Sequence, residues 1–298
     1  MFTTLVAVIA ALVLGHLAPA QMAALRDWRW FGRWLAWVQG QSETAQDNRH
    51  ALWLAILPCV LVVAALQWLL SGRLYGLPSL LFGIAVLALC WGPRDLDRDV
   101  EAVIDAEDAN ACGVAISQLQ CAGGSLREDT PSLVDATVIN GLRRWFAPLF
   151  WFLLLGPWGV LLYRLLAQAV HGAQGALLSP AAREDGNTFL KILEWPVAQL
   201  MTLAMALAGN FDTVSSAWRR AGGSRASLSI GFLAEAARAS VGAELVEEAE
   251  AAEAARLEGM LPADERFPEL RDAMSLVWRM LLLWMVVLAL MIIAGWVG

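Results

Sequence analysis

The sequence feature that most constrains this fold is the apolar run over residues 145–169, which holds one charged residue, Arg164. A helix of this length is sufficient to cross a hydrocarbon layer roughly 30 Å thick. The middle of the run reads Gly-Pro-Trp-Gly, and Pro157 lacks the N–H that an unbroken helix needs. The run therefore predicts a kinked membrane helix, packed against other spans that satisfy the backbone groups released at the kink.

Two interpretations of the Gly-Pro-Trp-Gly element stay open. In the simpler one, the element only bends a membrane helix to fit its neighbours. In the other, it breaks the helix so that the loosened backbone lines a functional site. The first interpretation needs no ligand and is favoured.

The composition agrees with a membrane protein that has several spans. Of the 298 residues, 58% are hydrophobic, and the mean hydropathy is +0.56. Soluble domains are rarely this apolar. Besides the central run, spans are expected over residues 51–70, 74–91 and 276–297, with residues 1–20 and 189–209 as further candidates. The predicted fold class is all-α: a polytopic helical membrane protein with about four to six transmembrane helices and two cytoplasmic helical segments.

Alternation of apolar and polar stretches divides the chain into five parts. Polar segments are expected to be cytoplasmic helical regions, the first with one amphipathic helix from Leu96 to Ala115. A loop is expected over residues 168–188. Lys191 and Glu194 are spaced to pair on one helix face, and the alternative is that both side chains extend to the membrane interface. The parts are N-terminal membrane helices over 1–91, a cytoplasmic segment over 92–144, a membrane core over 145–209, a cytoplasmic segment over 210–275 and a last transmembrane helix over 276–298.

Residues 25–38 form an unusual element within the first part. Arg26, Arg29 and Arg33 fall on one helical stripe, and Trp28, Phe31 and Leu35 follow another. Arginine opposite tryptophan is typical of a helix that lies in the headgroup region. The sequence favours a membrane-surface anchor here, with recognition of a lipid or another ligand as the alternative.

Arginine counts predict the orientation of the spans. Residues 21–50 hold four arginines, 92–144 hold five and 210–275 hold seven, whereas 71–73 and 170–187 hold one each. Because basic residues accumulate in cytoplasmic loops, this alternation fits six spans with both termini outside.

Several classes of function are disfavoured. A net charge of −7 with no sustained basic stripe does not suggest nucleic-acid binding. Lys191 is the only lysine and is not part of a phosphate-binding Gly-Lys-Ser/Thr motif. The four cysteines lack zinc spacing, and His16, His50 and His171 are far apart. No metal and no cofactor are therefore expected.

The central segment carries a likeness to a known family. Residues 135–167 include Ala-Pro-Leu-Phe-Trp at 147–151, Gly-Pro-x-Gly at 156–159 and Tyr-Arg at 163–164, and a second matching run covers residues 193–211. In these elements the chain resembles the AmpE/CobD-like family of bacterial inner-membrane proteins. The resemblance implies a multi-pass protein of the bacterial inner, cytoplasmic membrane.

The family has two arms. One contains CobD/CbiB-type synthases, which attach an aminopropanol unit to cobyric acid by an amide bond. The other is AmpE, a regulatory membrane protein linked to β-lactamase induction and peptidoglycan recycling, and hence to antibiotic resistance. The synthase pattern Glu-Asn-x-x-Asp falls on residues 139–143, where only Asn140 agrees and Ile139 and Arg143 replace the acids. Acids of this kind hold the metal of a nucleotide-dependent synthase, so the departures favour the AmpE arm and a non-catalytic role.

The resemblance and the kink together suggest a candidate functional cluster. Asp185 and Asn187 resemble an Asp-x-Asn element of the family, although the arginine counts place them outside. Alternatives to an AmpE-like regulator are a CobD/CbiB-like amide synthase and a transporter of a cell-wall-derived solute. The expected partners are the lipid bilayer and a protein on the cytoplasmic segments, and oligomerisation is compatible with the sequence. The cluster is Asn140, Pro148, Trp151, Gly156, Pro157, Gly159, Tyr163, Arg164, Asp185 and Asn187.

Overall fold

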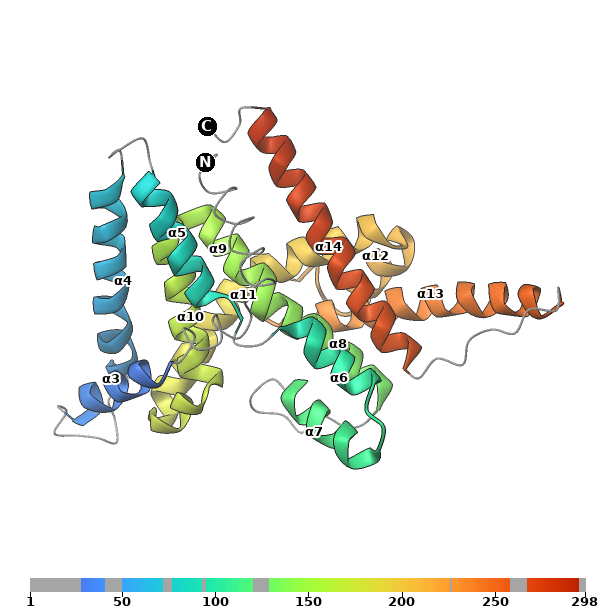
Figure 1. The fold of residues 1–298 in the computed structure, drawn as a ribbon, viewed down its shortest axis with the longest axis horizontal. Helices are drawn as coiled ribbons and strands as arrows, with labels where there is room; N and C mark the ends of the chain where they lie inside the picture. Colours follow the sequence, from blue (N-terminus) through green and yellow to red (C-terminus); the bar gives the residue numbers. More distant parts are fainter. Residues whose placement is uncertain are drawn as a thin grey trace. The chain divides into compact units, whose positions relative to one another are not determined.

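A computed structural model describes residues 28–40, 50–71, 77–92, 95–119, 129–225, 227–257 and 267–294. Within these ranges every regular element is a helix (Figure 1). Four helical stretches are long and apolar enough to cross a membrane: Ala51–Leu70, Thr130–Leu155, Pro180–Ala208 and Pro268–Met291. The predicted class of a polytopic all-α membrane protein is therefore confirmed. The span expected over residues 1–20 lies outside the described residues.

The chain divides into two compact units. The first contains residues 1–94, 143–194 and 288–298. Its centre is helix α10, which packs against α4, α5, α9 and the 3-10 turn η3. The side chain of Tyr163, on α10, is fully buried. The elements of this unit are α3 (Arg29–Gly40), α4 (Ala51–Leu70), α5 (Leu77–Cys90), most of the π-helix η2 (Leu142–Phe146), α9 (Ala147–Leu155), α10 (Pro157–His171), η3 (Ala173–Leu177) and the first half of α11 (Pro180–Ala208).

The second unit contains residues 95–142 and 195–287. Helix α13 packs against α8 and α12, and α6 packs against α7 and α8. An ion pair of 3.0 Å between Arg238 Nε and Asp135 Oδ1 links α13 to α8. The helices that lie wholly or mainly in this unit are α6 (Leu96–Ile104), α7 (Ala109–Leu119), α8 (Thr130–Gly141), α12 (Phe211–Arg220), α13 (Gly231–Leu257) and α14 (Pro268–Ile293).

The expected single helix from Leu96 to Ala115 is wrong. The structure has two helices, α6 and α7, separated at residues 105–108. Asp108 explains the second start, because its Oδ1 accepts a hydrogen bond of 2.6 Å from the N–H of Ala111. A carboxylate in this position caps a helix N-terminus, although the apolar spacing continues across the turn.

The loop expected over residues 168–188 is also wrong. Helix α10 continues to His171, and α11 begins at Pro180. Ser179 caps α11, since its Oγ accepts from the N–H of Ala182 at 3.2 Å. A serine followed by proline is a recognised helix start. Asp185 and Asn187 therefore lie on a helix.

Exposed apolar side chains cover helix α4. Leu61 is 64% exposed, and Trp68, near the end of the helix, is 80% exposed. Such a surface is costly in water and favourable against acyl chains. The exposed apolar residues of α4 are Leu54, Leu57, Leu61, Val62, Leu66, Trp68 and Leu69.

Candidate functional site

Helices α9 and α10 are separated by one residue, Gly156. Its backbone angles are φ 76° and ψ −156°, a conformation that is essentially restricted to glycine. The N–H of Gly156 still donates to Phe152 O at 2.8 Å, which completes α9. Pro157 then occupies the first turn of α10, where its missing N–H is tolerated. The Gly-Pro-Trp-Gly element thus ends one helix and starts the next.

A glutamine from helix α4 bridges this break. Gln67 Nε2 donates to the carbonyl of Leu155 at 3.4 Å, and Gln67 Oε1 accepts from the N–H of Trp158 at 3.3 Å. One side-chain amide therefore joins the last residue of α9 to the first turn of α10. Sequence reasoning missed Gln67. The available signal was that it is the only amide or charged side chain between Ala51 and Leu70, and polar groups inside membrane helices usually have a partner.

Gly159 and Pro148 shape the same region. A Cβ placed on Gly159 would come within 2.8 Å of the carbonyl oxygen of Trp151, so α10 passes the end of α9 too closely for any larger residue. Pro148 is buried in the first turn of α9. Both residues act through packing.

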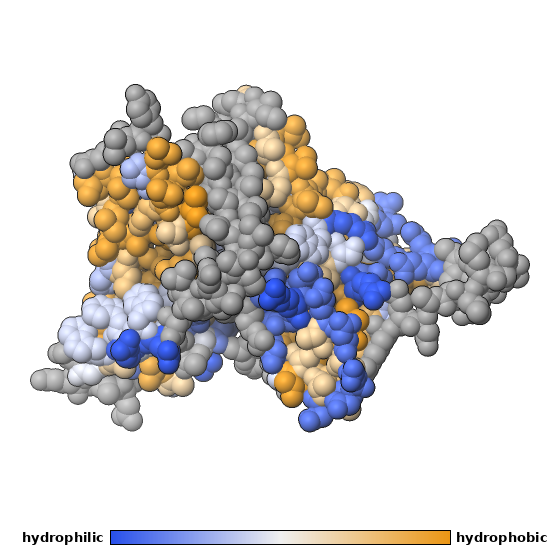
Figure 2. All heavy atoms as spheres, in the orientation of Figure 1, coloured by the Kyte–Doolittle hydropathy of each residue, from blue (hydrophilic) through white to orange (hydrophobic). Residues whose placement is uncertain are grey.

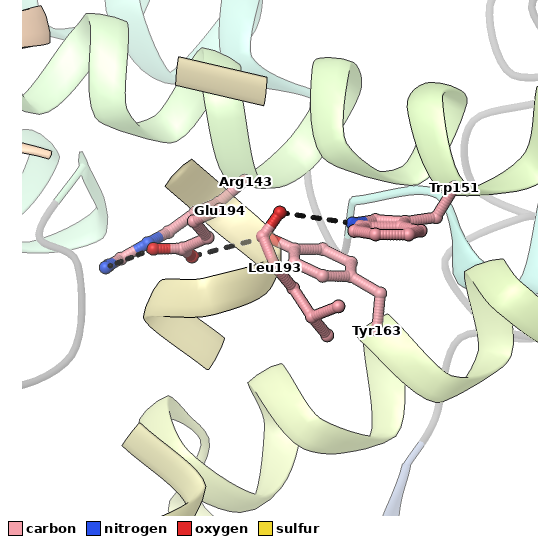
Figure 3. A network of polar contacts seen from close by, with 5 residues as sticks. All are labelled: Arg143, Trp151, Tyr163, Leu193 and Glu194. Atoms are coloured by element: carbon pink, nitrogen blue, oxygen red, sulfur yellow. Dashed lines mark hydrogen bonds and ion pairs between the residues drawn. The ribbon is translucent and has the colours of Figure 1, made fainter. Parts of the chain in front are cut away.

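A buried polar network joins Arg143, which precedes α9, to Tyr163 on α10 and Glu194 on α11 (Figure 3). Arg143 Nε donates to Glu194 Oε1 at 2.9 Å, and Arg143 Nη2 donates to Glu194 Oε2 at 3.4 Å. The hydroxyl of Tyr163 donates to Glu194 Oε1 at 3.4 Å. Glu194 is only 1% exposed. The carboxylate is therefore held by a two-point arginine contact and a phenol, which is the arrangement that a buried charge requires.

Trp151 joins the network to helix α11. Its Nε1 donates to the carbonyl of Leu193 at 3.3 Å, beside Glu194 (Figure 3). The neighbouring ring of Phe150 meets the Trp151 ring edge-on, with centroids 5.1 Å apart. Trp151 and Tyr163, from α9 and α10, thus reach consecutive residues of α11.

The pairing of Lys191 with Glu194, suggested by their spacing, does not occur. Lys191 is exposed, and Glu194 faces the interior, where Arg143 binds it. The partner of Glu194 was missed because Arg143 lies 51 residues away in the chain.

Asn140 does not belong to this network. It lies in the second unit, on α8, and is 4% exposed. Its Nδ2 donates to Leu119 O at 2.7 Å and to Ala136 O at 2.8 Å. One amide hydrogen therefore joins α8 to the end of α7, and the other is bound within α8 itself.

The remaining candidates lie in the first unit, near the network in sequence or on α11. Arg164 follows Tyr163 on α10 and is buried, with 5% exposure. Asp185 and Asn187 are half-buried in the first turns of α11. Between them, Gly186 approaches α4 closely, since a Cβ there would lie 2.8 Å from Leu52 Cδ2. No group of three or more His, Cys, Asp or Glu residues with metal-binding geometry occurs among the described residues.

Replacing Gln67 by leucine tests the bridge. Gln67→Leu is expected to lower the free energy of unfolding by about 1–2 kcal/mol, because two backbone groups beside the break lose their partner within the membrane. The measurement is the unfolding midpoint in mixed micelles titrated with SDS. Gln168→Leu on α10 is the matched control, since the structure gives Gln168 no side-chain hydrogen bond with the described residues. Equal midpoints for the two variants would contradict the bridge.

His171, at the end of α10 and beyond the apolar run, titrates abnormally. Burial, reinforced by the positive charges of Arg143 and Arg183, lowers the pKa of His171 to about 3. Its Nε2 is buried and has no hydrogen-bond partner among the described residues. The imidazole is therefore neutral at physiological pH.

This depressed pKa predicts acid sensitivity. An unfolded histidine titrates near about 6.5, so below that pH the unfolded chain binds a proton that the folded chain rejects, and stability falls toward about pH 3. His171→Gln is expected to lessen the fall in melting temperature between about pH 7 and pH 4.5. His50→Gln, at an exposed position, serves as the control. An unchanged pH profile for His171→Gln would be the contrary result.

Comparison with known protein families places this chain among them. The family described as "Regulatory signalling modulator protein AmpE" matches residues 27–297, nearly the whole chain. A search of curated proteins gave no match, and neither did a search of solved structures. The match covers α3, the Gly156 break and the Arg143–Glu194 network alike. The chain, a membrane protein of several helices, therefore belongs to the AmpE family of regulatory signalling modulators.

Proposed function

We propose that this chain is an AmpE-type regulator of the bacterial inner membrane, which modulates β-lactamase induction in connection with peptidoglycan recycling and does not itself catalyse a reaction. The observation that carries the proposal is the contact that Arg143 makes in the structure. This position aligns with an acid of the synthase pattern, and here its guanidinium forms an ion pair with buried Glu194.

Asn140 supports the same conclusion. It is the one residue of the synthase pattern that this chain keeps, and both of its amide hydrogens donate to backbone carbonyls. An amide that is already satisfied in this way stabilises helix packing and has no donor left for a substrate. A regulator would instead act through a protein partner, which we place on the segments 92–144 and 210–275.

The test is deletion of the gene in its natural host, followed by β-lactamase assay with and without an inducing β-lactam. Deletion is expected to change the induced β-lactamase level several-fold. Expression of the wild-type chain is expected to restore the original level. Gly242→Ala, a change on open helix surface, is expected to restore it equally. Unaltered induction after deletion would overturn the proposal.

Two further assays separate the alternatives. Amide formation between cobyric acid and an aminopropanol donor in membranes that carry the chain would support the synthase. Uptake of a cell-wall peptide into proteoliposomes would support a transporter, an option that draws on the helix break at Gly156. Neither activity is expected.

A further inference from the structure

Helix α3 presents two different faces. Its inner face is apolar and packs against α4 and η3. On its outer face, exposed tryptophans lie beside exposed arginines, so the two residue types are not confined to opposite sides of the helix. The buried residues are Phe31, Leu35 and Val38. The exposed residues include Arg29, Trp30, Arg33 and Trp37.

The outer face is held in a fixed position. Trp34 Nε1 donates to the carbonyl of Ala55 on α4 at 2.9 Å. The rings of Trp34 and Trp37 are stacked, with centroids 5.1 Å apart and an interplanar angle of 18°. Because Trp37 is 57% exposed, this stack extends an indole ring from an anchored residue to the surface. A surface fixed in advance loses little conformational freedom on binding.

The position of α3 along α4 corresponds to the depth of lipid headgroups. The apolar exposed face of α4 begins at Leu54, next to the residue that Trp34 contacts. At the far end of α4, Trp68 is exposed. Helix α4 has 20 residues, and such a helix is about 30 Å long, the thickness of the hydrocarbon layer. Figure 2 shows apolar spheres over α4 and pale and strongly hydrophilic spheres over α3 at its foot.

The charge of α3 selects the kind of lipid. The helix carries Arg29 and Arg33 and no acidic residue. Arg33 forms no ion pair with the described residues. A guanidinium group binds phosphate oxygens at two points, and indole rings prefer the boundary between headgroups and acyl chains.

We propose that the outer face of α3 binds the headgroups of anionic phospholipids, with the two arginines on the phosphates and Trp30 and Trp37 against the glycerol and upper acyl chains. This goes beyond anchoring, because it predicts a preference for lipids with net negative charge. It is also independent of the proposed regulatory role.

The full-length chain, reconstituted in vesicles, provides the test. Brominated phosphatidylglycerol and brominated phosphatidylcholine quench tryptophan fluorescence on contact, so competition between them gives a relative association constant. The wild-type chain is expected to prefer phosphatidylglycerol. Arg29→Gln with Arg33→Gln is expected to lower that preference about tenfold, and salt to weaken it in the wild type.

Matched variants localise the effect. Arg219→Gln with Arg220→Gln removes two exposed arginines from α12 and is expected to keep the wild-type preference. Trp30→Phe with Trp37→Phe is expected to remove the most strongly quenched part of the fluorescence. The proposal fails if the α3 arginine variant keeps the wild-type preference, or if the α12 variant loses as much.

Discussion

Gly156→Ala is expected to destabilise the protein by about 2–4 kcal/mol, because alanine is strained in the backbone conformation that joins α9 to α10. Gly156 has φ 76° and ψ −156°. The added Cβ would also lie 2.7 Å from Gln67 Nε2, so the bridging amide must move and its two hydrogen bonds weaken. The measurement is the unfolding midpoint in SDS-containing mixed micelles.

Two companion variants separate strain from collision. Gly242→Ala is the control, since a Cβ there meets nothing within 4 Å and alanine favours a helix. Gln67→Ala combined with Gly156→Ala removes the collision together with the bridge and leaves the backbone strain, so at most partial recovery is expected. If Gly156→Ala matched Gly242→Ala, the positive φ would not be needed and the break would be an ordinary bend.

An interruption at the Gly-Pro-Trp-Gly element was predictable because its cause is local, although the favoured expectation was a bend and the structure has a break between two helices. Proline lacks an N–H wherever it stands, and glycine beside it permits the rare backbone angles. The group that satisfies the break was not predictable in the same way. Gln67 is visible as an isolated polar residue in an apolar span, yet only the folded structure brings it to Leu155 and Trp158.

Other misassignments share this origin. Periodicity joined α6 and α7 into one helix because the apolar spacing persists, while the helix end depends on a single capping contact from Asp108. Lys191 was the nearest cation to Glu194 in sequence, whereas Arg143 is nearest in space. Spacing along a helix shows which residues can meet on that helix. Which cation pairs with a buried carboxylate depends instead on the segments that pack around it in the folded chain.

Glu194→Ala is expected to lower the free energy of unfolding by about 3 kcal/mol, the second large effect. Glu194 is 1% exposed and Arg143 is 21% exposed, so truncation takes the carboxylate of Glu194 away from a mostly buried guanidinium. The hydroxyl of Tyr163 loses its acceptor as well. Glu194→Gln is expected to cost less, because the amide oxygen still accepts hydrogen bonds.

A more exposed ion pair of the same type supplies the control for Glu194→Ala. Arg279 binds Glu244 at 2.8 Å, with 44% and 20% of the two side chains exposed. Glu244→Ala is therefore expected to cost at most about 1 kcal/mol. Equal losses for Glu194→Ala and Glu244→Ala would show that burial does not govern the Arg143–Glu194 pair.

The double variant Arg143→Leu with Glu194→Leu identifies what the buried ion pair contributes. Leucine at both positions removes the two charges together, so most of the stability lost in Glu194→Ala is expected to return. If the proposed regulator needs the pair for signalling, this stable variant will still fail to restore β-lactamase induction in the deletion strain. If it restores induction fully, the network serves packing alone, and the signalling surface must be sought elsewhere on the chain.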